Sequence, residues 1–371
     1  MSWKRVKVHD CIEFFNGKGI KTELHTGDNP IYGANGIIGS TKESNYSNGI
    51  IIGRVGAYCG AVQVEKGTFW ATDNTIVAKA KRDNDNQFWY YQFSDLKLNK
   101  YAGGAAQPLV TQSVLKEIDI DLPPLETQKR IAKILSAYDD LIENNLKRIK
   151  LLEEAAQNIY KEWFVNFRFP GSEHTEFING LPNGWERKAY SKVAEFVNGF
   201  AFKPSHHFYD GIPIIKIKEL KSGIAEDTPR NSGEDIPLKY HFDDGSIIFS
   251  WSADIDAYWW SNGKALLNQH LFLVLPSYPN ANEYFYFALK NSMQDFRNRT
   301  TGATMKHIKR TELDNVLCVV PVEDTVKEFC KVTSPILSLI TNLNQQNQKL
   351  KEARDILLPR LMNRTIEVGG S

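Results

Sequence analysis

The sequence WKRVKVHDCIEFFNGKGIK occupies residues 3–21 and returns as WERKAYSKVAEFVNGFAFK at residues 185–203. The two stretches share Trp, Arg, Glu-Phe, Asn-Gly and the final Lys in the same order and spacing. A match of this length at one fixed shift indicates an internal repeat, in which a single structural unit occurs more than once. We therefore predict that the chain is built from two copies of one unit.

Further matches follow in the same order, at shifts that grow only slightly. The segment NGIIIG (48–53) matches DGSIIF (244–249) at a shift of 196 residues, and ETQK (126–129) matches DTVK (324–327) at a shift of 198. Short insertions in the second copy explain this growth. A unit of about 185 residues thus occurs twice, which is too long for coincidence.

Each copy has the same internal plan. Its first part, of about 120 residues, contains short β-like runs separated by Asn-Gly, Gly-Gly and Asp-Gly turn signals. Prolines end this part, and an uninterrupted helical stretch follows at about residues 127–166 and about residues 325–363. We predict an α/β (α+β) fold, in which two similar β-rich domains are separated by two long helices.

Both helical stretches carry apolar residues at alternating steps of three and four, which predicts a coiled-coil seam. An internal duplication favours a two-fold relation, and hence antiparallel helices. If paired residue numbers sum to 492, Asn145 faces Asn347, and this polar layer fixes the register because a slip would bury an amide against leucine. The predicted seam comprises Leu135, Tyr138, Leu141 or Ile142, Asn145, Ile149, Leu152, Ala156, Ile159 and Trp163, and then Ile336, Ile340, Leu343, Asn347, Leu350, Arg354, Leu357 and Leu361.

The composition is typical of a globular protein and narrows the classes of function. Apolar residues make up 42% and charged residues 24% of the chain, and no apolar run is long enough to span a membrane. The N-terminus lacks the apolar stretch of a signal peptide. The cysteines lie too far apart for a disulfide framework or a CxxC metal site, which favours the reducing cytoplasm. A net charge of +1 leaves DNA binding open, because local clustering rather than the total decides it.

Three segments in and around the first helical stretch are distinctive, namely LPPLETQKRIA (122–132), LIENN (141–145) and YKEWFVNFRFPG (160–171). They resemble the first conserved region of the specificity subunits of type I restriction-modification systems. LKEARDILLPRLMNR (350–364) resembles the second. Two shorter pieces resemble motifs of the recognition domains, namely LPNGW at residues 181–185 and IYGANGIIG at residues 31–39.

The resemblance covers essentially the whole chain and implies its domain organisation. It implies a first target-recognition domain at residues 1–124 and a second at residues 186–320. It further implies a long spacer and docking helix at residues 125–169, a linker at residues 170–185 and a second long helix at residues 321–371. The match is loosest in the second recognition domain.

The resemblance also implies a non-catalytic, cytoplasmic DNA-binding subunit. Each recognition domain is expected to contact one half of a bipartite, asymmetric double-stranded DNA target, with the helices fixing the spacing. Two modification (methyltransferase) subunits are expected to dock on the helices, and restriction (ATP-dependent translocase/endonuclease) subunits to join them. S-adenosylmethionine, ATP and Mg are expected on those partners, and no cofactor on this chain.

Two equivalent segments are candidates for DNA contact, namely GGAAQPLVTQS at residues 103–113 and TGATMKHIKRT at residues 301–311. Each begins with small residues and leads into a short helix, where backbone N–H groups can meet a phosphate. A glutamine can read adenine, and cationic side chains add attraction to the backbone. A plain helix-entry turn is the alternative for both. The predicted contacts here are Gln107, Thr111, Thr304, Lys306, His307 and Lys309.

Other candidates are scattered over both copies. Arg54 follows a predicted strand and suits guanine or phosphate, with a surface salt bridge as the alternative. Trp251 can stack on DNA or pack in the core, together with Trp259 and Trp260. Asn35 lies in a tight turn, where its left-handed backbone is an equal explanation. Three lysines complete the set of predicted DNA contacts, Lys21 and Lys203 at equivalent places and Lys216.

Two segments resemble catalytic motifs only partially. Asn-Pro-Ile-Tyr at residues 29–32 resembles the NPPY loop of amino-methyltransferases but lacks its second proline and a glycine-rich fingerprint for the methyl donor. Glu219 and Lys221 have the Glu-x-Lys spacing of metal nucleases without a partner aspartate. A stand-alone methyltransferase or nuclease stays an alternative function, as does a coiled-coil scaffold, but we predict no catalytic and no metal-binding residues.

Overall fold

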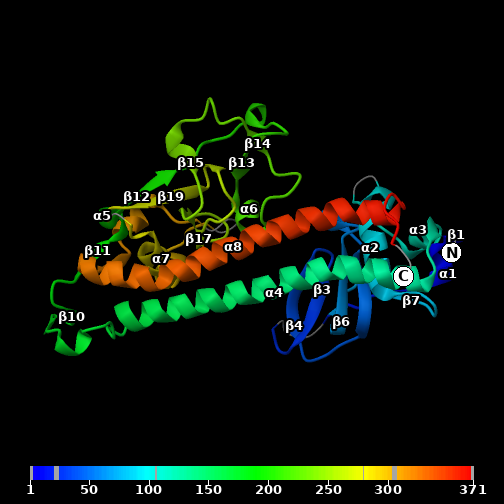
Figure 1. Ribbon diagram of the computed structural model, residues 1–371, viewed down its shortest axis with the longest axis horizontal. Coiled ribbons are helices and arrows are strands. Elements are labelled where there is room, and N and C mark those ends of the chain that lie inside the picture. Colours follow the sequence, from blue (N-terminus) through cyan, green and yellow to red (C-terminus); the bar gives the residue numbers. More distant parts are fainter. Residues whose placement is uncertain (1–2, 21–24, 105–106, 279, 303–306, 369–371) are drawn as a thin grey trace. The chain divides into compact units, whose positions relative to one another are not determined.

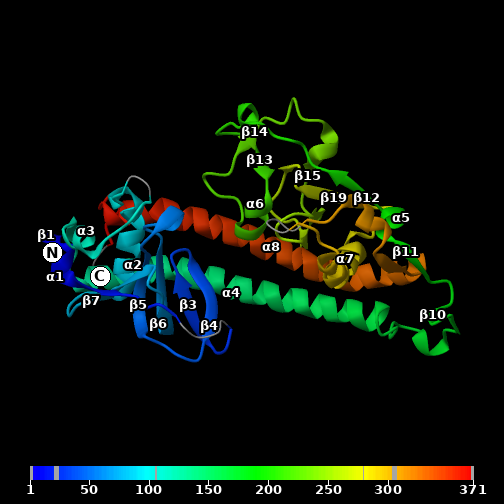
Figure 2. The same cartoon turned by 180° about the vertical axis from the view of Figure 1, so that it is seen from behind.

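The computed structural model describes residues 3–20, 25–104, 107–278, 280–302 and 307–368. The chain divides into two compact units, shown from opposite sides in Figures 1 and 2. Unit 1 comprises Met1–Asp140 together with Lys351–Ser371, and unit 2 comprises Leu141–Leu350. Both units combine sheets with helices, so the predicted mixed fold class is confirmed.

Unit 1 is built on a six-stranded sheet with the order β2-β7-β5-β6-β3-β4, while β1 pairs with β8. The central strands β5 and β7 carry the apolar runs Ile50–Ile52 and Ile76–Ala78, which are buried on both faces of the sheet. Ile50 and Ile52 pack with α2 residues such as Trp89, whereas the alternate residue Ile51 packs with Tyr32 on the other face. The elements are β1 (Lys4–Lys7), α1 (Val8–Cys11), β2 (Ile12–Asn16), β3 (Asn29–Gly33), β4 (Gly36–Thr41), β5 (Tyr46–Gly53), β6 (Val62–Ala71), β7 (Thr75–Ala80), α2 (Asn86–Asp95), α3 (Gln112–Lys116) and β8 (Asp119–Leu122).

Unit 2 repeats this plan with its strands divided between two sheets. Its main sheet has the order β12-β19-β16-β17, β11 pairs with β20, and its second sheet has the order β14-β13-β18-β15. The parallel pair of β13 with β18 is the counterpart of the parallel pair of β3 with β6 in unit 1. The elements are β9 (Phe177–Ile178), β10 (Leu181–Pro182), β11 (Glu186–Ala189), α5 (Tyr190–Val193), β12 (Ala194–Asn198), β13 (Ile212–Ile215), α6 (Ile217–Ser222), β14 (Arg230–Asn231), β15 (His241–Phe242), β16 (Ile247–Ser250), β17 (Asp256–Trp259), β18 (Ala265–Leu267), β19 (Leu271–Pro276), α7 (Asn282–Asn298) and β20 (Leu317–Val320).

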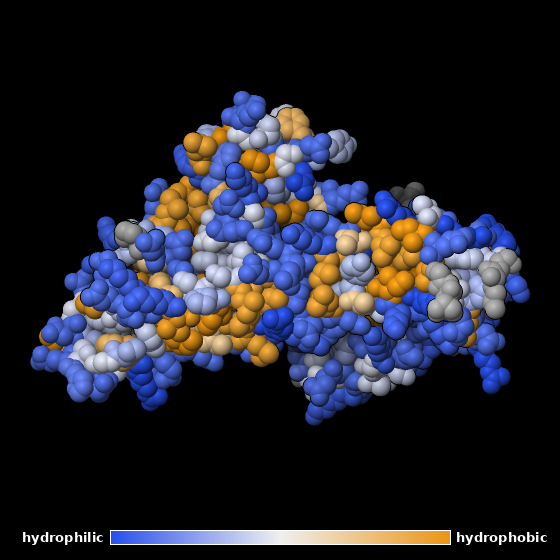
Figure 3. All heavy atoms as spheres, in the orientation of Figure 1, coloured by the Kyte–Doolittle hydropathy of each residue, from blue (hydrophilic) through white to orange (hydrophobic). Residues whose placement is uncertain are grey.

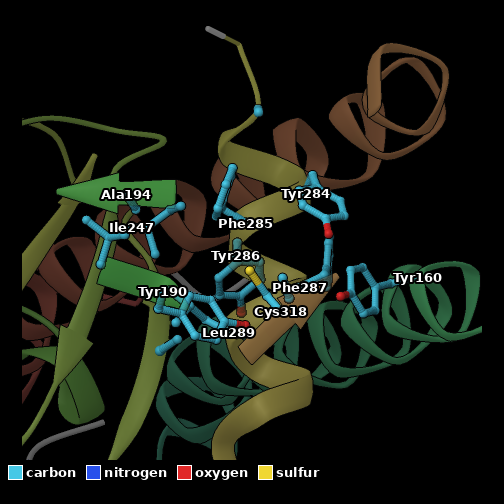
Figure 4. Packing of buried hydrophobic residues seen from close by; sticks show 14 of the residues in the cluster. Tyr160, Tyr190, Ala194, Ile247, Tyr284, Phe285, Tyr286, Phe287, Leu289 and Cys318 are labelled. Carbon is cyan, nitrogen blue, oxygen red and sulfur yellow. The ribbon is translucent and has the colours of Figure 1, made fainter. Parts of the chain in front are cut away.

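The core of unit 2 is dominated by aromatic side chains from α7. Tyr284, Phe285 and Phe287 are each at most 2% exposed and lie against Tyr190 of α5 and Tyr160 (Figure 4). Tyr284 and Tyr160 rings lie 5.8 Å apart at their centroids, within the range in which aromatic pairs attract each other. These rings account for much of the apolar surface that the unit buries.

The backbone near the start of the central strand is held in the same way in both units. The Asn86 side chain at the start of α2 donates from Nδ2 to the Asn48 carbonyl at 3.3 Å, and Asn282 at the start of α7 donates to the Gly245 carbonyl at 3.0 Å. Asn48 (φ 45°) and Gly245 (φ 82°) both have left-handed backbones. The two residues are therefore equivalent, at a shift of 197 residues.

The predicted alignment of this region was wrong by one residue. Sequence similarity paired NGIIIG with DGSIIF at a shift of 196, which matches Asn48 with Asp244. In the sheets, however, Ile50 pairs with Ala78 and Ile247 with Val274, and these strand partners are themselves equivalent. A run of similar apolar residues fits either shift, whereas backbone hydrogen bonding permits only one.

The two long helices are α4 (Leu125–Phe164) and α8 (Glu323–Met362), each of 40 residues. Both begin two residues earlier than predicted, and at α4 the amides of Thr127 and Gln128 donate to the Pro124 carbonyl. Within the described residues, no helix is long and apolar enough to cross a bilayer.

The predicted antiparallel pairing of the helices is confirmed in both units. In unit 2 the Asn145 Nδ2 donates to Asn347 Oδ1 at 2.9 Å, as the sum of 492 required. In unit 1 Arg354 Nη1 donates to Asp139 Oδ1 at 2.5 Å. Of the two alternatives for one seam position, Ile142 is buried and Leu141 is 46% exposed.

One position of the second seam was assigned to the wrong residue. Leu337 is 1% exposed, whereas its predicted neighbour Ile336 is only partly buried. Adjacent apolar residues leave the choice open in the sequence, and packing against α4 and α7 decides it.

We expect alanine at Gly17 or Gly199 to destabilise the fold, because a Cβ there would lie 1.8 Å from the Thr72 carbonyl oxygen or 2.1 Å from that of Asn268. The cost should be about 1–3 kcal/mol, measured by urea unfolding. Gly19→Ala is the matched control, since nothing lies within 4 Å of its Cβ position. Equal stability of all three variants would contradict the close approach.

Candidate nucleic-acid interface

The same closed loop occurs in both units, at the two segments predicted to contact DNA. In unit 1 Gly103 and Leu109 exchange both backbone N–H···O bonds, at 2.9 and 2.8 Å. In unit 2 Thr301 and His307 do the same, both at 2.9 Å. These paired backbone bonds fix both ends of the loop in each unit.

Each loop is tied to the residue that follows the central strand. The Val110 amide donates to the Arg54 carbonyl at 2.9 Å, and the Ile308 amide donates to the Trp251 carbonyl at 2.9 Å. Arg54 and Trp251 therefore occupy equivalent positions. The sequence alignment did not pair these two residues. The backbone hydrogen bond at this position is the same in both units, but the side chain is arginine in unit 1 and tryptophan in unit 2.

Arg54 lies in a group of predicted contact residues in unit 1. The carbonyl of Ala34, in the β3–β4 turn, lies 2.3 Å from where a Cβ on the preceding Gly53 would stand, so that turn lies beside Arg54. On the other side the Gly56 amide donates to the Pro108 carbonyl at 3.1 Å, which brings the neighbouring Gln107 close. One end of the sheet thus gathers Asn35, Arg54 and Gln107.

The guanidinium of Arg54 is half-buried, and no ion pair among the described residues includes it. The salt-bridge alternative for Arg54 therefore finds no support in that part of the chain. A charged group without a protein partner at the end of a strand can meet a phosphate or a guanine edge. Contact with DNA stays a prediction.

Asn35 is exposed in the two-residue turn between β3 and β4. The left-handed residue of this turn is Gly36, with φ +106°, and Asn35 is not among the residues of positive φ. The backbone explanation offered for Asn35 was therefore wrong, because the adjacent glycine supplies the required conformation. Its side chain is left available for contact.

Thr111 and Lys309 are equivalent residues at the starts of two short helices, α3 and η6 (Arg310–Asp314). The Thr111 hydroxyl accepts from the Val114 amide at 3.3 Å, so its helix-capping role is observed. Lys309 makes no such cap and is exposed. The same position thus carries a neutral capping side chain in unit 1 and a positively charged side chain without a capping role in unit 2.

Trp251 is half-buried at the corresponding surface of unit 2. Its ring centroid lies 5.7 Å from that of the exposed His270 and 5.9 Å from that of Phe272. The guanidinium of Arg310 lies 5.7 Å from the Phe272 centroid. The indole Nε1 is buried and has no hydrogen-bond partner in the described part of the chain. Of the other tryptophans considered, Trp260 is 2% exposed and belongs to the core.

The remaining predicted contacts of unit 2 lie around its second sheet, β14-β13-β18-β15. Lys203 is exposed at the start of a short helix. Lys216 is half-buried and precedes α6, and its amide donates to Glu219 Oε2 at 3.0 Å. Burial, followed by the charge of Lys216, lowers the pKa of His207. Both lysines stay predictions as DNA contacts.

Three predicted contacts, Lys21, Thr304 and Lys306, lie outside the described residues.

The two partial catalytic motifs have structural roles. Glu219 is 2% exposed, and it accepts from the Lys216 amide and from the Thr228 hydroxyl at 3.4 Å. Asn29 donates from Nδ2 to the carbonyls of Lys42 and Glu43 across the β3–β4 pair. Among the described residues, no group of three His, Cys, Asp or Glu side chains could hold a metal ion.

Sequence reasoning missed two exposed side chains of these surfaces. Tyr58, 54% exposed, belongs to the segment whose Gly56 amide bonds to the loop at Pro108. The ring of His270, in the turn before β19, lies near that of Trp251 at a tilted angle. Its turn corresponds to Thr-Asp-Asn before β7, which carries no signal for a histidine.

Comparisons with known proteins agree with this arrangement. The family model described as "Type I restriction modification DNA specificity domain" matches residues 1–154 and 182–352. The type I restriction enzyme MjaIX specificity subunit of Methanocaldococcus jannaschii is 28% identical over 301 residues, which are 75% of this chain and 68% of that one. The HindI specificity subunit of Haemophilus influenzae is 23% identical over 324 residues, 69% of this chain and 71% of that one.

A solved structure shares the fold. The crystal structure of the type I restriction-modification system S subunit from M. genitalium has a TM-score of 0.57 at 16% identity, and the match covers 98% of this chain and 96% of that one. The family model matches the large majority of the chain, and it matches in two parts that correspond to the internal repeat. The chain therefore belongs to the type I restriction-modification DNA specificity family.

Proposed function

We propose that each unit of this specificity subunit contacts one half of a bipartite, asymmetric DNA target. The observation that carries the proposal is the pair of equivalent loops and strand ends, which combine one backbone frame with different side chains. Arg54, Leu109 and Thr111 in unit 1 correspond to Trp251, His307 and Lys309 in unit 2. Equivalent frames with unlike contact chemistry favour two unlike half-sites.

Two recognition domains also suit the energetics of rare-site selection. Each specified base pair contributes about 1–3 kcal/mol of discrimination, so a single small domain selects too weakly. Two domains on one chain add their readout and impose a gap between half-sites. We propose recognition domains at residues 1–124 and 186–320, joined through the helices at residues 125–169 and 321–371 and the linker at residues 170–185.

We propose that the chain catalyses no reaction and binds no cofactor of its own. The structural roles of Glu219 and Asn29 support this, because neither motif presents a free catalytic side chain. S-adenosylmethionine, ATP and Mg are assigned to two modification subunits and to restriction subunits. The four cysteines are buried and free of disulfides, which fits a cytoplasmic location.

The long helices are proposed to fix the gap and to dock the modification subunits. A 40-residue helix spans about 60 Å. Outside the seam, α4 exposes Leu146 (53%) and Leu151 (64%), and α8 exposes Val332 (45%) and Leu339 (37%). Figure 3 shows hydrophobic side chains at the surface over these helices. Exposed apolar side chains of this kind mark binding surfaces for partner proteins.

The function is tested by co-expressing the chain with type I modification subunits and mapping methylated bases on genomic DNA. We expect one bipartite motif whose two halves differ in sequence. DNA turnover by the purified chain with S-adenosylmethionine or Mg alone would contradict the assignment. So would co-expression that yields no sequence-selective methylation.

Arg54→Ala should relax the motif in one half-site only. Losing a bidentate arginine contact should reduce methylation of the target by about 5- to 100-fold, while other bases become tolerated at that position. Trp251→Ala should affect the other half-site. Arg82→Ala is the matched control, because Arg82 is exposed beyond Ala80, at the opposite end of β7 from the Gly53–Thr75 pair. Identical effects of Arg54→Ala and Arg82→Ala on the motif would refute the contact.

Insertion of one heptad into each long helix should widen the gap. Seven residues add about 10.5 Å of helix, which corresponds to roughly three base pairs at 3.4 Å each. Motif mapping with the lengthened chain measures the change. An unchanged gap in a complex that still methylates DNA would show that the helices do not set the spacing.

A further inference from the structure

A hydrogen-bonded charged layer joins the two long helices in unit 1. Arg354 of α8 donates to Asp139 of α4 at 2.5 Å, and the hydroxyl of Tyr91 in α2 donates to the same carboxylate at 2.5 Å. The two charged side chains are each about a quarter exposed. Burial lowers the pKa of Arg354, but its bonds to Asp139 and Asp355 more than offset this, so the net shift is upward.

The equivalent layer of unit 2 is entirely apolar. Both ends of α4 and α8 correspond at a shift of 198 residues, and the first residues of α2 and α7 at a shift of 196. Tyr91, Asp139 and Arg354 are therefore replaced in order by three residues that are each at most 1% exposed. These residues are Phe287, Leu337 and Ala156.

The asparagine layer likewise has an apolar layer as its equivalent in the repeat. Asn145 and Asn347, 1% and 4% exposed, correspond at the same shift to Leu343 and Ile149, which are also buried. The asparagines form one hydrogen bond, and Asn145 Oδ1 and Asn347 Nδ2 have no partner in the described part of the chain. A half-satisfied buried amide pair costs stability relative to an apolar layer, so its presence calls for another explanation.

We infer that the two polar layers make α4 pair with α8 and exclude pairing between the like helices of two copies of this chain. An antiparallel α4–α4 pair would set Asn145 against Ile149 and Asp139 against Ala156, each twice. An α8–α8 pair would set Asn347 against Leu343 and bury Arg354 beside Leu337. Each mismatch leaves a buried polar group without its partner.

The danger of like pairing arises from the duplication itself. Two nearly equivalent helices with matching seams can pair with themselves as well as with each other. The first half of the chain also emerges first during synthesis, when only copies of α4 are present to meet one another. The polar layers thereby keep two unlike units within each molecule. This inference stands independently of any DNA contact.

The test starts from the folded, full-length protein with a protease site inserted at the exposed Asn179–Gly180 turn between β9 and β10. The linker is cut under native conditions, and the halves are incubated in dilute urea until their pairing stops changing. Native mass spectrometry then counts unlike and like pairs of halves. In the wild type we expect like pairs below about one in a hundred, since each layer should contribute about tenfold.

The decisive variant replaces both polar layers with their apolar equivalents, and like pairs should rise to about half of all complexes, the statistical value for halves without preference. Asn145→Leu and Asn347→Ile alone should give an intermediate fraction. The matched control, Lys147→Asn with Lys150→Asn, changes exposed residues of α4 and should leave the fraction of like pairs at the wild-type value. The full variant carries Tyr91→Phe, Asp139→Leu, Arg354→Ala, Asn145→Leu and Asn347→Ile.

Mixing ¹⁵N-labelled with unlabelled cut protein reports whether the halves have exchanged. Exchange of label without like pairs in the five-substitution variant would overturn the inference, because the heads rather than the layers would then select the partner. Frequent like pairs in the wild type would overturn it as well. If the variant does not fold, Phe287→Tyr with Leu337→Asp and Ala156→Arg gives α4 and α8 both charges. This chain should form an intermediate fraction of like pairs, because its asparagine layer still opposes them.

Discussion

The burial of the end of α8 in unit 1 is the constraint on which the rest of the structure depends. Leu361 and Met362 join the core that contains α2 and the central strands, although more than 200 residues separate them from those elements in the chain. Likewise α4 contributes Leu125–Asp140 to unit 1 and its remaining turns to unit 2. Unit 1 is therefore assembled from two separate segments of the chain, so the pairing of α8 with α4 must be correct before its core can close.

This constraint explains why the seam carries polar layers that reduce its own stability. A seam of leucine and isoleucine throughout would bury more apolar surface, but it would leave direction and partner unspecified. The Tyr91–Asp139–Arg354 group in unit 1 and the Asn145–Asn347 bond in unit 2 supply that information. Stability is exchanged for a single outcome of folding.

Periodic features were predictable from the sequence, and aperiodic ones were not. The repeat, the helices and the facing asparagines follow from patterns that extend over many residues. The one-residue offset between β5 and β16 was not predicted, because a run of similar isoleucines does not show which residue pairs with which. The candidate site was the hardest part to predict, because the equivalence of Arg54 and Trp251 rests on backbone hydrogen bonds from the distant residues Val110 and Ile308. Asp139 and Tyr91 lie outside the predicted seam, so their bond with Arg354 was also missed.

The equivalent backbone positions at Asn48 and Gly245 have a consequence for the exchange of segments between the two copies of the repeat. Both have left-handed backbones and accept a hydrogen bond from the asparagine that begins the following helix, α2 or α7. A crossover at these two residues would keep every strand pair in register, while a crossover one residue away would turn each following side chain to the opposite face. Recombination within a duplicated gene therefore has a natural junction here, through which one unit could acquire the contact residues of the other without losing its core.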